Sequence, residues 1–314
     1  MQGGKEMSSR GLCHLSNTYR CINRNLQRHG TPSDATVAAV MSLAIHEDLK
    51  GQHQNSRVHL DALVRMVQLR GGITDFEATG ILLHKICRVD IEYALQNGSR
   101  PRLSRDDFPR NLLGSKMASL SMLQYETFSS DNPEIYDFTL QQVFNDLMSV
   151  SYLLNHDTAC FRLEPFAYQE ILLSVCYRLI HRYPLAHTGY GYGNDHEELL
   201  YLGLLAFATT LLFQHTFQRL SYPLLTERLR SAIVRLLNRG LMNNPMTLWL
   251  LLIGGISVFD NADNRTWLVS HIKRFVSKFQ IGTWSALREE ISNFPWFNMI
   301  HEGPGYQLWQ ALSS

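Results

Sequence analysis

Apolar side chains recur every three to four residues from about Asn17 to the end of the sequence, and this spacing constrains the fold more than any other feature. A helix returns to the same face after 3.6 residues, so the spacing predicts amphipathic helices. No segment of the sequence shows the alternation of apolar and polar residues that is typical of a half-buried strand. The sequence therefore predicts an all-α fold, a single multi-helix array of antiparallel helix pairs joined by short turns.

Turn residues divide this pattern into helices. Thr31 is a candidate N-cap before Pro32, and Gly71 and Gly72 suit the left-handed backbone at a helix end. The expected domain organisation is a poorly ordered tail over 1–16 and one helical, regulatory-type domain over 17–314, with an irregular connection near 98–133. The predicted helices cover 17–28, a segment from 32–34 onward, 55–70, a segment from about 74 to 97, 133–155, 165–183, 195–214, 224–239, 245–259, 262–279, 284–294 and a short terminal piece.

Composition excludes several classes of protein. The 29 Lys and Arg against 28 Asp and Glu give a net charge of +1, so no strong field attracts nucleic acid or an anionic membrane. The apolar stretches over 199–213 and 247–259 fall short of the roughly 20 residues that a membrane span needs, so they are expected to be buried core helices. The five cysteines include no C-x-x-C pair, which favours a reducing compartment over a disulfide framework.

No motif for bond-making chemistry stands out, and we predict no catalytic, cofactor-binding or metal-ligating residues. The thirteen histidines include no H-E-x-x-H pair. The glycine-tyrosine run over 189–193 lacks the Lys-Ser or Lys-Thr of a phosphate loop, so we interpret it as a turn. Cys87 and Cys176 lie among apolar residues and are expected to be inert. Neighbouring acids such as Glu197 and Glu198 point about 100° apart on a helix and are expected to serve structural or solvated roles.

Arg20, Arg24 and Arg28 form the most distinctive polar pattern. Their four-residue spacing places all three on one face of the first predicted helix. Such a face suits contact with phosphate or with an acidic partner segment, but three charges supply little of the affinity of a DNA site, so a solvated face is the simpler interpretation. The basic connection that contains Arg100, Arg102, Arg105 and Arg110 is a second candidate, for nuclear import.

Two segments carry a family resemblance. Residues 34–73 contain a His-centred helix that ends in Arg-Gly-Gly, and residues 248–309 combine paired glycines with tryptophans. In this order the two segments resemble the regulatory, or middle homology, domain of fungal-specific transcription factors. The residues that carry the resemblance, which we expect to be mainly structural, are His59, Leu60, Leu63, Met66, Val67, Arg70, Gly71, Gly72, Trp249, Gly254, Gly255, Arg265, Trp267, Trp284, Phe294, Trp296 and Trp309.

The resemblance implies a helical transcription regulator in the nucleus, with the cytoplasm as an alternative. Such proteins usually carry a Zn₂Cys₆ cluster with six closely spaced cysteines, whereas this sequence has five in total. We therefore expect no zinc-cluster module and no direct sequence-specific DNA binding in this chain. It is expected to act through protein partners, either of the transcription machinery or a DNA-binding regulator, or through an apolar small-molecule effector. The alternative is a non-transcriptional small-molecule-binding or scaffold protein with a pocket between helices of its Tyr- and Trp-rich second half. The oligomeric state stays open.

Overall fold

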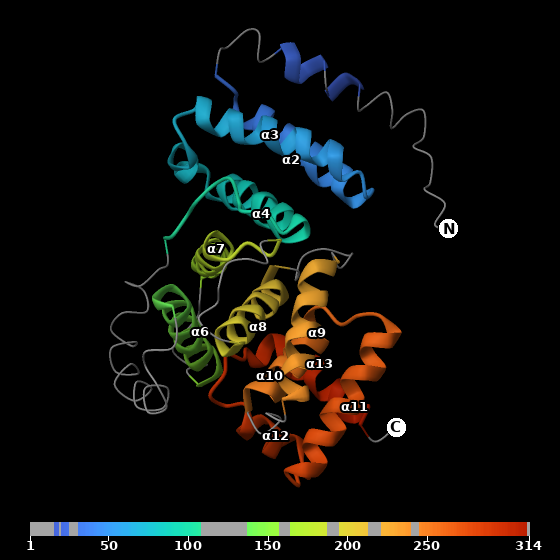
Figure 1. Cartoon of the computed structure of the whole chain (residues 1–314). Helices are drawn as coiled ribbons and strands as arrows, with labels where there is room; N and C mark the ends of the chain where they lie inside the picture. The colour runs from blue at the N-terminus through green and yellow to red at the C-terminus, as the bar shows by residue number, and fades with distance from the viewer. Residues whose placement is uncertain are drawn as a thin grey trace. The chain divides into compact units, whose positions relative to one another are not determined.

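A computed structural model describes residues 16–18, 20–24, 31–107, 137–156, 164–186, 195–212, 221–239 and 245–312. Throughout these ranges every regular element is a helix, which confirms the predicted all-α fold (Figure 1). The Cα atoms pack as two compact units, the first formed by Met1–Tyr93 with Pro101–Arg105 and the second by Ala94–Arg100 with Asp106–Ser314. The single domain over 17–314 stays a prediction. Most of the expected tail and much of the irregular connection lie outside the described residues.

In the first unit, helix α2 (Asp34–Leu49) packs along helix α3 (His53–Leu69). A short turn reverses the chain between them, and Gly51 provides its positive φ of 72°. Val37, Leu60 and Leu63 are fully buried along the contact. Thr31 was the expected cap of α2, but the N-cap is Ser33, whose side chain accepts a hydrogen bond from the Thr36 amide. The start signal was correct, and the capping hydroxyl lies two residues later than predicted.

The start of the fourth predicted helix is wrong in one respect. The chain first forms a 3₁₀ helix, η1 (Ile73–Thr79), and only then the α-helix α4 (Gly80–Asn97). The helical spacing of this segment predicts Ile81, Leu82, Ile86 and Val89 on the inward face. Ile86 and Val89 are buried as predicted, but Ile81 is 76% exposed, and Leu83 is fully buried.

A buried carboxylate fixes the segment that follows α4. Asp90 is 1% exposed and accepts hydrogen bonds from the backbone amides of Arg102 and Leu103 at 2.8–3.0 Å. These bonds compensate the charge for its loss of water and hold the connection against the helix. Two of the arginines proposed for nuclear import also pair within this unit, Arg102 with Asp61 and Arg105 with Glu77.

The second unit is a layered helical body around two apolar helices, α8 and α10. Every residue of α10 from Met246 to Ile256 is buried, and α10 contacts α8, α9, α11 and α13. Among the described residues, no helix combines the length and hydropathy needed to cross a membrane. The helices of this unit are α6 (Phe138–His156), α7 (Pro165–Arg182), α8 (Asp195–Leu212), α9 (Pro223–Asn238), α10 (Pro245–Ser257), α11 (Ala262–Lys278), α12 (Trp284–Glu290) and α13 (Asn298–Gln310).

Gly98, which ends α4, is expected to tolerate no side chain. Its φ is +66°, and an added Cβ would lie 2.3 Å from Cδ2 of Leu224 and 2.7 Å from the backbone nitrogen of Ala186. Gly98→Ala is expected to lower the free energy of unfolding by about 2–3 kcal/mol, through backbone strain and overpacking together. Gly51→Ala is the matched control, because φ is also positive there but nothing lies within 4 Å. Equal losses in urea unfolding of the two variants would contradict the packing argument.

Candidate recognition sites

Arg70 is the centre of the first site. Its guanidinium pairs with the carboxylates of Asp34 at the start of α2 and Asp75 in η1, the latter at 2.7 Å, and lies 4.1 Å from the centroid of the Phe76 ring. Burial alone would lower the pKa of Arg70, but the hydrogen bonds that its guanidinium donates to the two carboxylates raise the pKa. These four residues, named here the Arg70 cluster, connect the start of α2 to the segment that follows α3.

The two glycines after Arg70 end helix α3 as the sequence predicted. Gly71 and Gly72 have φ values of +99° and +111°. The Gly72 amide donates to the carbonyl of Val67 and the Gly71 amide to that of Gln68, which is the Schellman arrangement. Only glycine takes these angles without strain, so the Arg-Gly-Gly pattern combines a charged connector with a helix stop.

Beside the Arg70 cluster lies a hollow of about 550 Å³ between α2, the end of η1 and the start of α4. We call it the α2–α4 hollow. Its lining is mostly apolar, with one acid and one base, and combines several small side chains with three larger apolar ones. The lining residues are Asp34, Ala35, Ala38, Met41, Ala78, Thr79, Gly80, Ile81, Leu82 and Lys85. A hollow of this size and lining is typical of sites that bind apolar groups.

Removing the Arg70 side chain is expected to loosen this region. Arg70→Ala loses two partly exposed ion pairs and the contact with Phe76, which together predict a fall of about 1–2 kcal/mol in the free energy of unfolding. Amide hydrogen exchange over 73–79 should accelerate in the variant. Arg65→Ala, at an exposed position of α3, is the control and should change neither quantity. Unchanged exchange over 73–79 in Arg70→Ala would show that the cluster does not hold η1.

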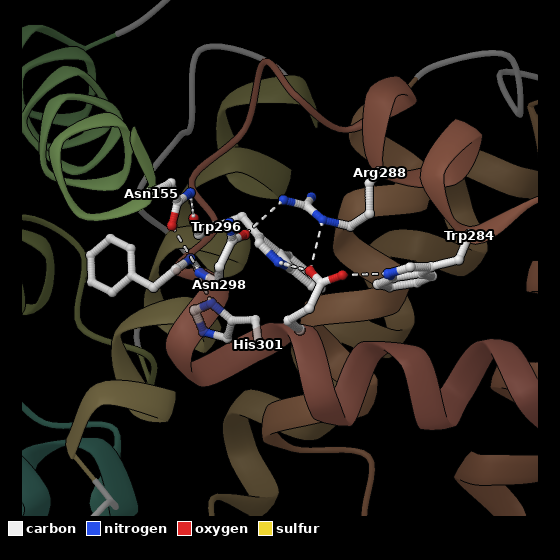
Figure 2. A network of polar contacts seen from close by, with 8 residues as sticks. Asn155, Trp284, Arg288, Trp296, Asn298 and His301 are labelled. Carbon is white, nitrogen blue, oxygen red and sulfur yellow. Dashed lines mark hydrogen bonds and ion pairs between the residues drawn. The ribbon is translucent and has the colours of Figure 1, made fainter. Parts of the chain in front are cut away.

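The second site gathers tryptophans around one carboxylate (Figure 2). Glu302 on α13 accepts hydrogen bonds from the indole nitrogens of Trp284 and Trp296 and from Nε of Arg288. Arg288 also lies 4.4 Å from the centroid of the Trp296 ring. These four residues form the Glu302 cluster. Three donors bind this carboxylate, so the arrangement joins α12, α13 and the segment between them.

The same network closes the start of α13, which has no side-chain N-cap of its own. The Asn155 side chain on α6 accepts from the Asn298 amide at 2.9 Å and donates to the carbonyl of Trp296 at 2.7 Å (Figure 2). His301 is fully buried, and its Nδ1 accepts from the Phe297 amide at 2.9 Å. Helix-end amides need such partners when water cannot reach them.

The Nε2 atom of His301 then carries the hydrogen. It lies 2.7 Å from Oγ1 of Thr210, and that hydroxyl donates to the carbonyl of Phe207 at 2.6 Å. A hydroxyl whose proton is committed accepts from its other partner, so Nε2–H donates to Thr210. Burial, and then the charge of Arg288, lowers the pKa of His301 to about 3. His301 is therefore a neutral structural group that sequence reasoning did not single out.

Glycines of the closing segment serve close packing and not backbone freedom. A Cβ on Gly254 would lie 2.4 Å from the ring of Phe259, and one on Gly255 would lie 2.5 Å from Leu268. These positions differ from Gly71 and Gly72, where φ is positive and nothing lies within 4 Å. The two glycine pairs are thus required for different physical reasons, one for positive φ angles and the other for close packing.

The remaining sequence candidates are distributed over both units. Trp267 is half-buried, and the guanidinium carbon of Arg230 lies 5.2 Å from the centroid of the Trp267 ring. Trp309 is half-buried near the end of α13. His59 is half-buried on α3, where burial lowers its pKa. Their structural role stays a prediction.

The candidate basic face is only partly described. Arg20 and Arg24 are exposed in a helical stretch of the first unit, and Arg28 lies outside the described residues, as does the turn over 189–193. The neighbouring acids of α8 do point apart: Glu197 accepts from the hydroxyl of Tyr183, and Glu198 pairs with Arg228. Within the described ranges, no three His, Cys, Asp or Glu side chains gather where they could hold a metal ion.

Comparison with known proteins decides the family. The family model for the fungal-specific transcription factor domain matches residues 2–290. The chain belongs to this family. The match confirms the resemblance found in the sequence, and membership of this family supports a transcription-regulator-like role. No curated protein and no solved structure matches the chain.

The α2–α4 hollow and the Glu302 cluster were not found from the sequence. Ala35, Ala38 and Lys85 belong to ordinary helical patterns, and nothing in their spacing marks a concave surface. Arg288 and Glu302 lie on different helices, so no short motif contains both. Only the tryptophans and the Arg-Gly-Gly pattern indicated where these sites lie.

Proposed function

We propose that this fungal-specific transcription factor domain is a regulatory, non-catalytic module that acts in the nucleus by recognising other molecules. Its targets are protein partners, either of the transcription machinery or a DNA-binding regulator, or an apolar small effector. Arg20, Arg24 and Arg28 are not proposed to recognise a DNA sequence. Contact of these side chains with DNA would be weak, independent of sequence and easily removed by salt.

The α2–α4 hollow is the observation that carries the proposal. It is a concave, mostly apolar surface beside the Arg70 cluster, so it offers a binding partner contact area next to a feature of the family resemblance. In the second site, in contrast, the Glu302 carboxylate is bound by donors of its own cluster. These contacts favour recognition at the first unit.

The alternative, a non-transcriptional small-molecule-binding or scaffold protein, places its pocket between helices of the second half. The α2–α4 hollow belongs to the first unit, because all of its lining residues lie between Asp34 and Lys85. This observation favours the regulatory proposal, and a pocket in the second half stays a separate prediction.

Tethering to a promoter tests the proposed function. The full chain fused to an unrelated DNA-binding module should change the output of a reporter that carries binding sites for that module, by several-fold relative to the module alone. A reporter without the sites is the control and should not respond. Equal output from the fusion and from the module alone, at equal protein levels, would contradict a regulatory role.

A further inference from the structure

The two walls of the α2–α4 hollow are helix faces. Asp34, Ala38 and Met41 follow one face of α2, and Ile81 and Lys85 follow one face of α4, four residues apart. The end of η1 closes one side with small residues. Small side chains on the α2 wall allow the backbone of another helix to approach closely, since interaxial distance depends on the side chains at the contact.

The hollow is open and apolar at its rim. Ile81 is 76% exposed, and Ala35 and Ala78 are exposed as well. A small molecule in such an open hollow would leave much of its apolar surface in water. A helix lying along it would cover Ile81 with its apolar face and keep its polar face in solvent, as in helix-in-groove recognition.

The charges of the hollow favour an acidic occupant. The Asp34 carboxylate is already paired with Arg70. Lys85 is exposed and forms no ion pair or hydrogen bond with any residue that the structure describes. The positive charge that remains for a ligand is therefore the ammonium group of Lys85, which complements a carboxylate.

We propose that the α2–α4 hollow binds an amphipathic helix of a protein partner, with apolar residues at i, i+3, i+4 and i+7 against Ala38 and Ile81 and a carboxylate against Lys85. The inference rests on the proposed function, since it assigns the partner contact of the regulatory module to this surface. It names the chemistry of that partner, an acidic amphipathic helix.

Peptide selection tests the chemistry directly. A displayed library of helical peptides about 15–20 residues long carries leucine at the four apolar positions and Glu, Gln or Lys at the flanking positions. It is selected on the full wild-type chain, on Ala38→Trp, which places a bulky ring in the hollow, and on Lys85→Glu, which reverses the charge. Lys273→Glu, exposed on α11, is the matched control. Thermal unfolding confirms that each variant folds.

The expected result is a charge swap. Peptides selected on wild type and on Lys273→Glu should carry Glu at the flank, and those selected on Lys85→Glu should carry Lys. A wild-type peptide should bind Lys85→Glu at least about tenfold more weakly, since like charges then face each other, and should not bind Ala38→Trp. The same flank composition on wild type and Lys85→Glu, or equal binding to Ala38→Trp, would overturn the inference.

The same variants distinguish the helix from two other possible occupants of the hollow. In one outcome, decanoate stabilises wild type but not Ala38→Trp against thermal unfolding, while no peptides are selected. That result would assign the hollow to a small apolar acid and overturn the proposed helical occupant. Dimerisation of wild type that Ala38→Trp abolishes would assign it to a second copy of the chain. None of these binding measurements involves transcription, so failure of the inference is distinguishable from failure of the tethered reporter.

Discussion

Trp296→Ala is expected to lower the free energy of unfolding by about 3–5 kcal/mol, the range for removing a large buried aromatic side chain. Trp296 is 2% exposed, and its contacts reach α6, α12 and α13 of the second unit. Its indole donates to Glu302, its face covers Arg288 at 4.4 Å, and its backbone amide donates to the hydroxyl of Ser151 at 3.1 Å. The truncation leaves a cavity and also removes a donor from Glu302.

Two further variants separate the parts of this effect. Trp296→Phe keeps most of the apolar volume but loses the indole N–H, so a smaller loss of about 1–2 kcal/mol is expected. Tyr306→Ala removes a ring that is 44% exposed and lies against Trp284, and it should cost about 1 kcal/mol or less. Urea unfolding followed by tryptophan fluorescence measures all three. A fall of only about 1 kcal/mol or less in the free energy of unfolding of Trp296→Ala would contradict the central place of the Glu302 cluster in the packing.

Acid is expected to destabilise the second unit through His301. Its pKa lies near 3 in the folded protein, against an ordinary value of 6.5. Because the unfolded chain binds the proton first, the stabilisation is complete above pH 6.5 and is lost progressively as the pH falls toward 3. At about 1.4 kcal/mol per pH unit, the loss is about 2 kcal/mol at pH 5 and about 3 kcal/mol at pH 4.

His301→Gln isolates this contribution, since glutamine does not titrate. The variant is less stable at pH 7 than the wild type, but its free energy of unfolding should fall less between pH 7 and pH 5, with a slope smaller by about one proton. Carboxylates titrate in both proteins and cancel in the comparison. Parallel pH profiles for the two proteins would show that His301 is not held neutral.

The sequence predicted the fold class and most helices because helical periodicity and turn residues are local signals. Pro165, Pro223 and Pro245 each begin a helix close to the predicted position. Errors arose where tertiary contacts decide. A 3₁₀ turn precedes Gly80, and Ile81 at the start of α4 is exposed; no local pattern distinguishes that turn from the first turn of a longer helix.

The sites were predictable only in part, since each depends on residues far apart in the sequence. Arg70 meets Asp34, and Asn155 meets Asn298, across distances that no spacing rule covers. His301 carries no motif, yet its burial and its two hydrogen bonds define it. Family resemblance located Arg70 and the tryptophans, but the chemistry of their surroundings, above all the α2–α4 hollow, follows from packing.

We expect regulation by this domain to go through recognition at the α2–α4 hollow. The most direct measurement is the promoter-tethered reporter output of Ala38→Trp beside wild type and Lys273→Glu, at equal protein levels and equal thermal stability. Ala38→Trp is expected to lose most of the reporter change, whereas Lys273→Glu should keep it. Full reporter change from a folded Ala38→Trp chain would show that regulation does not depend on the hollow.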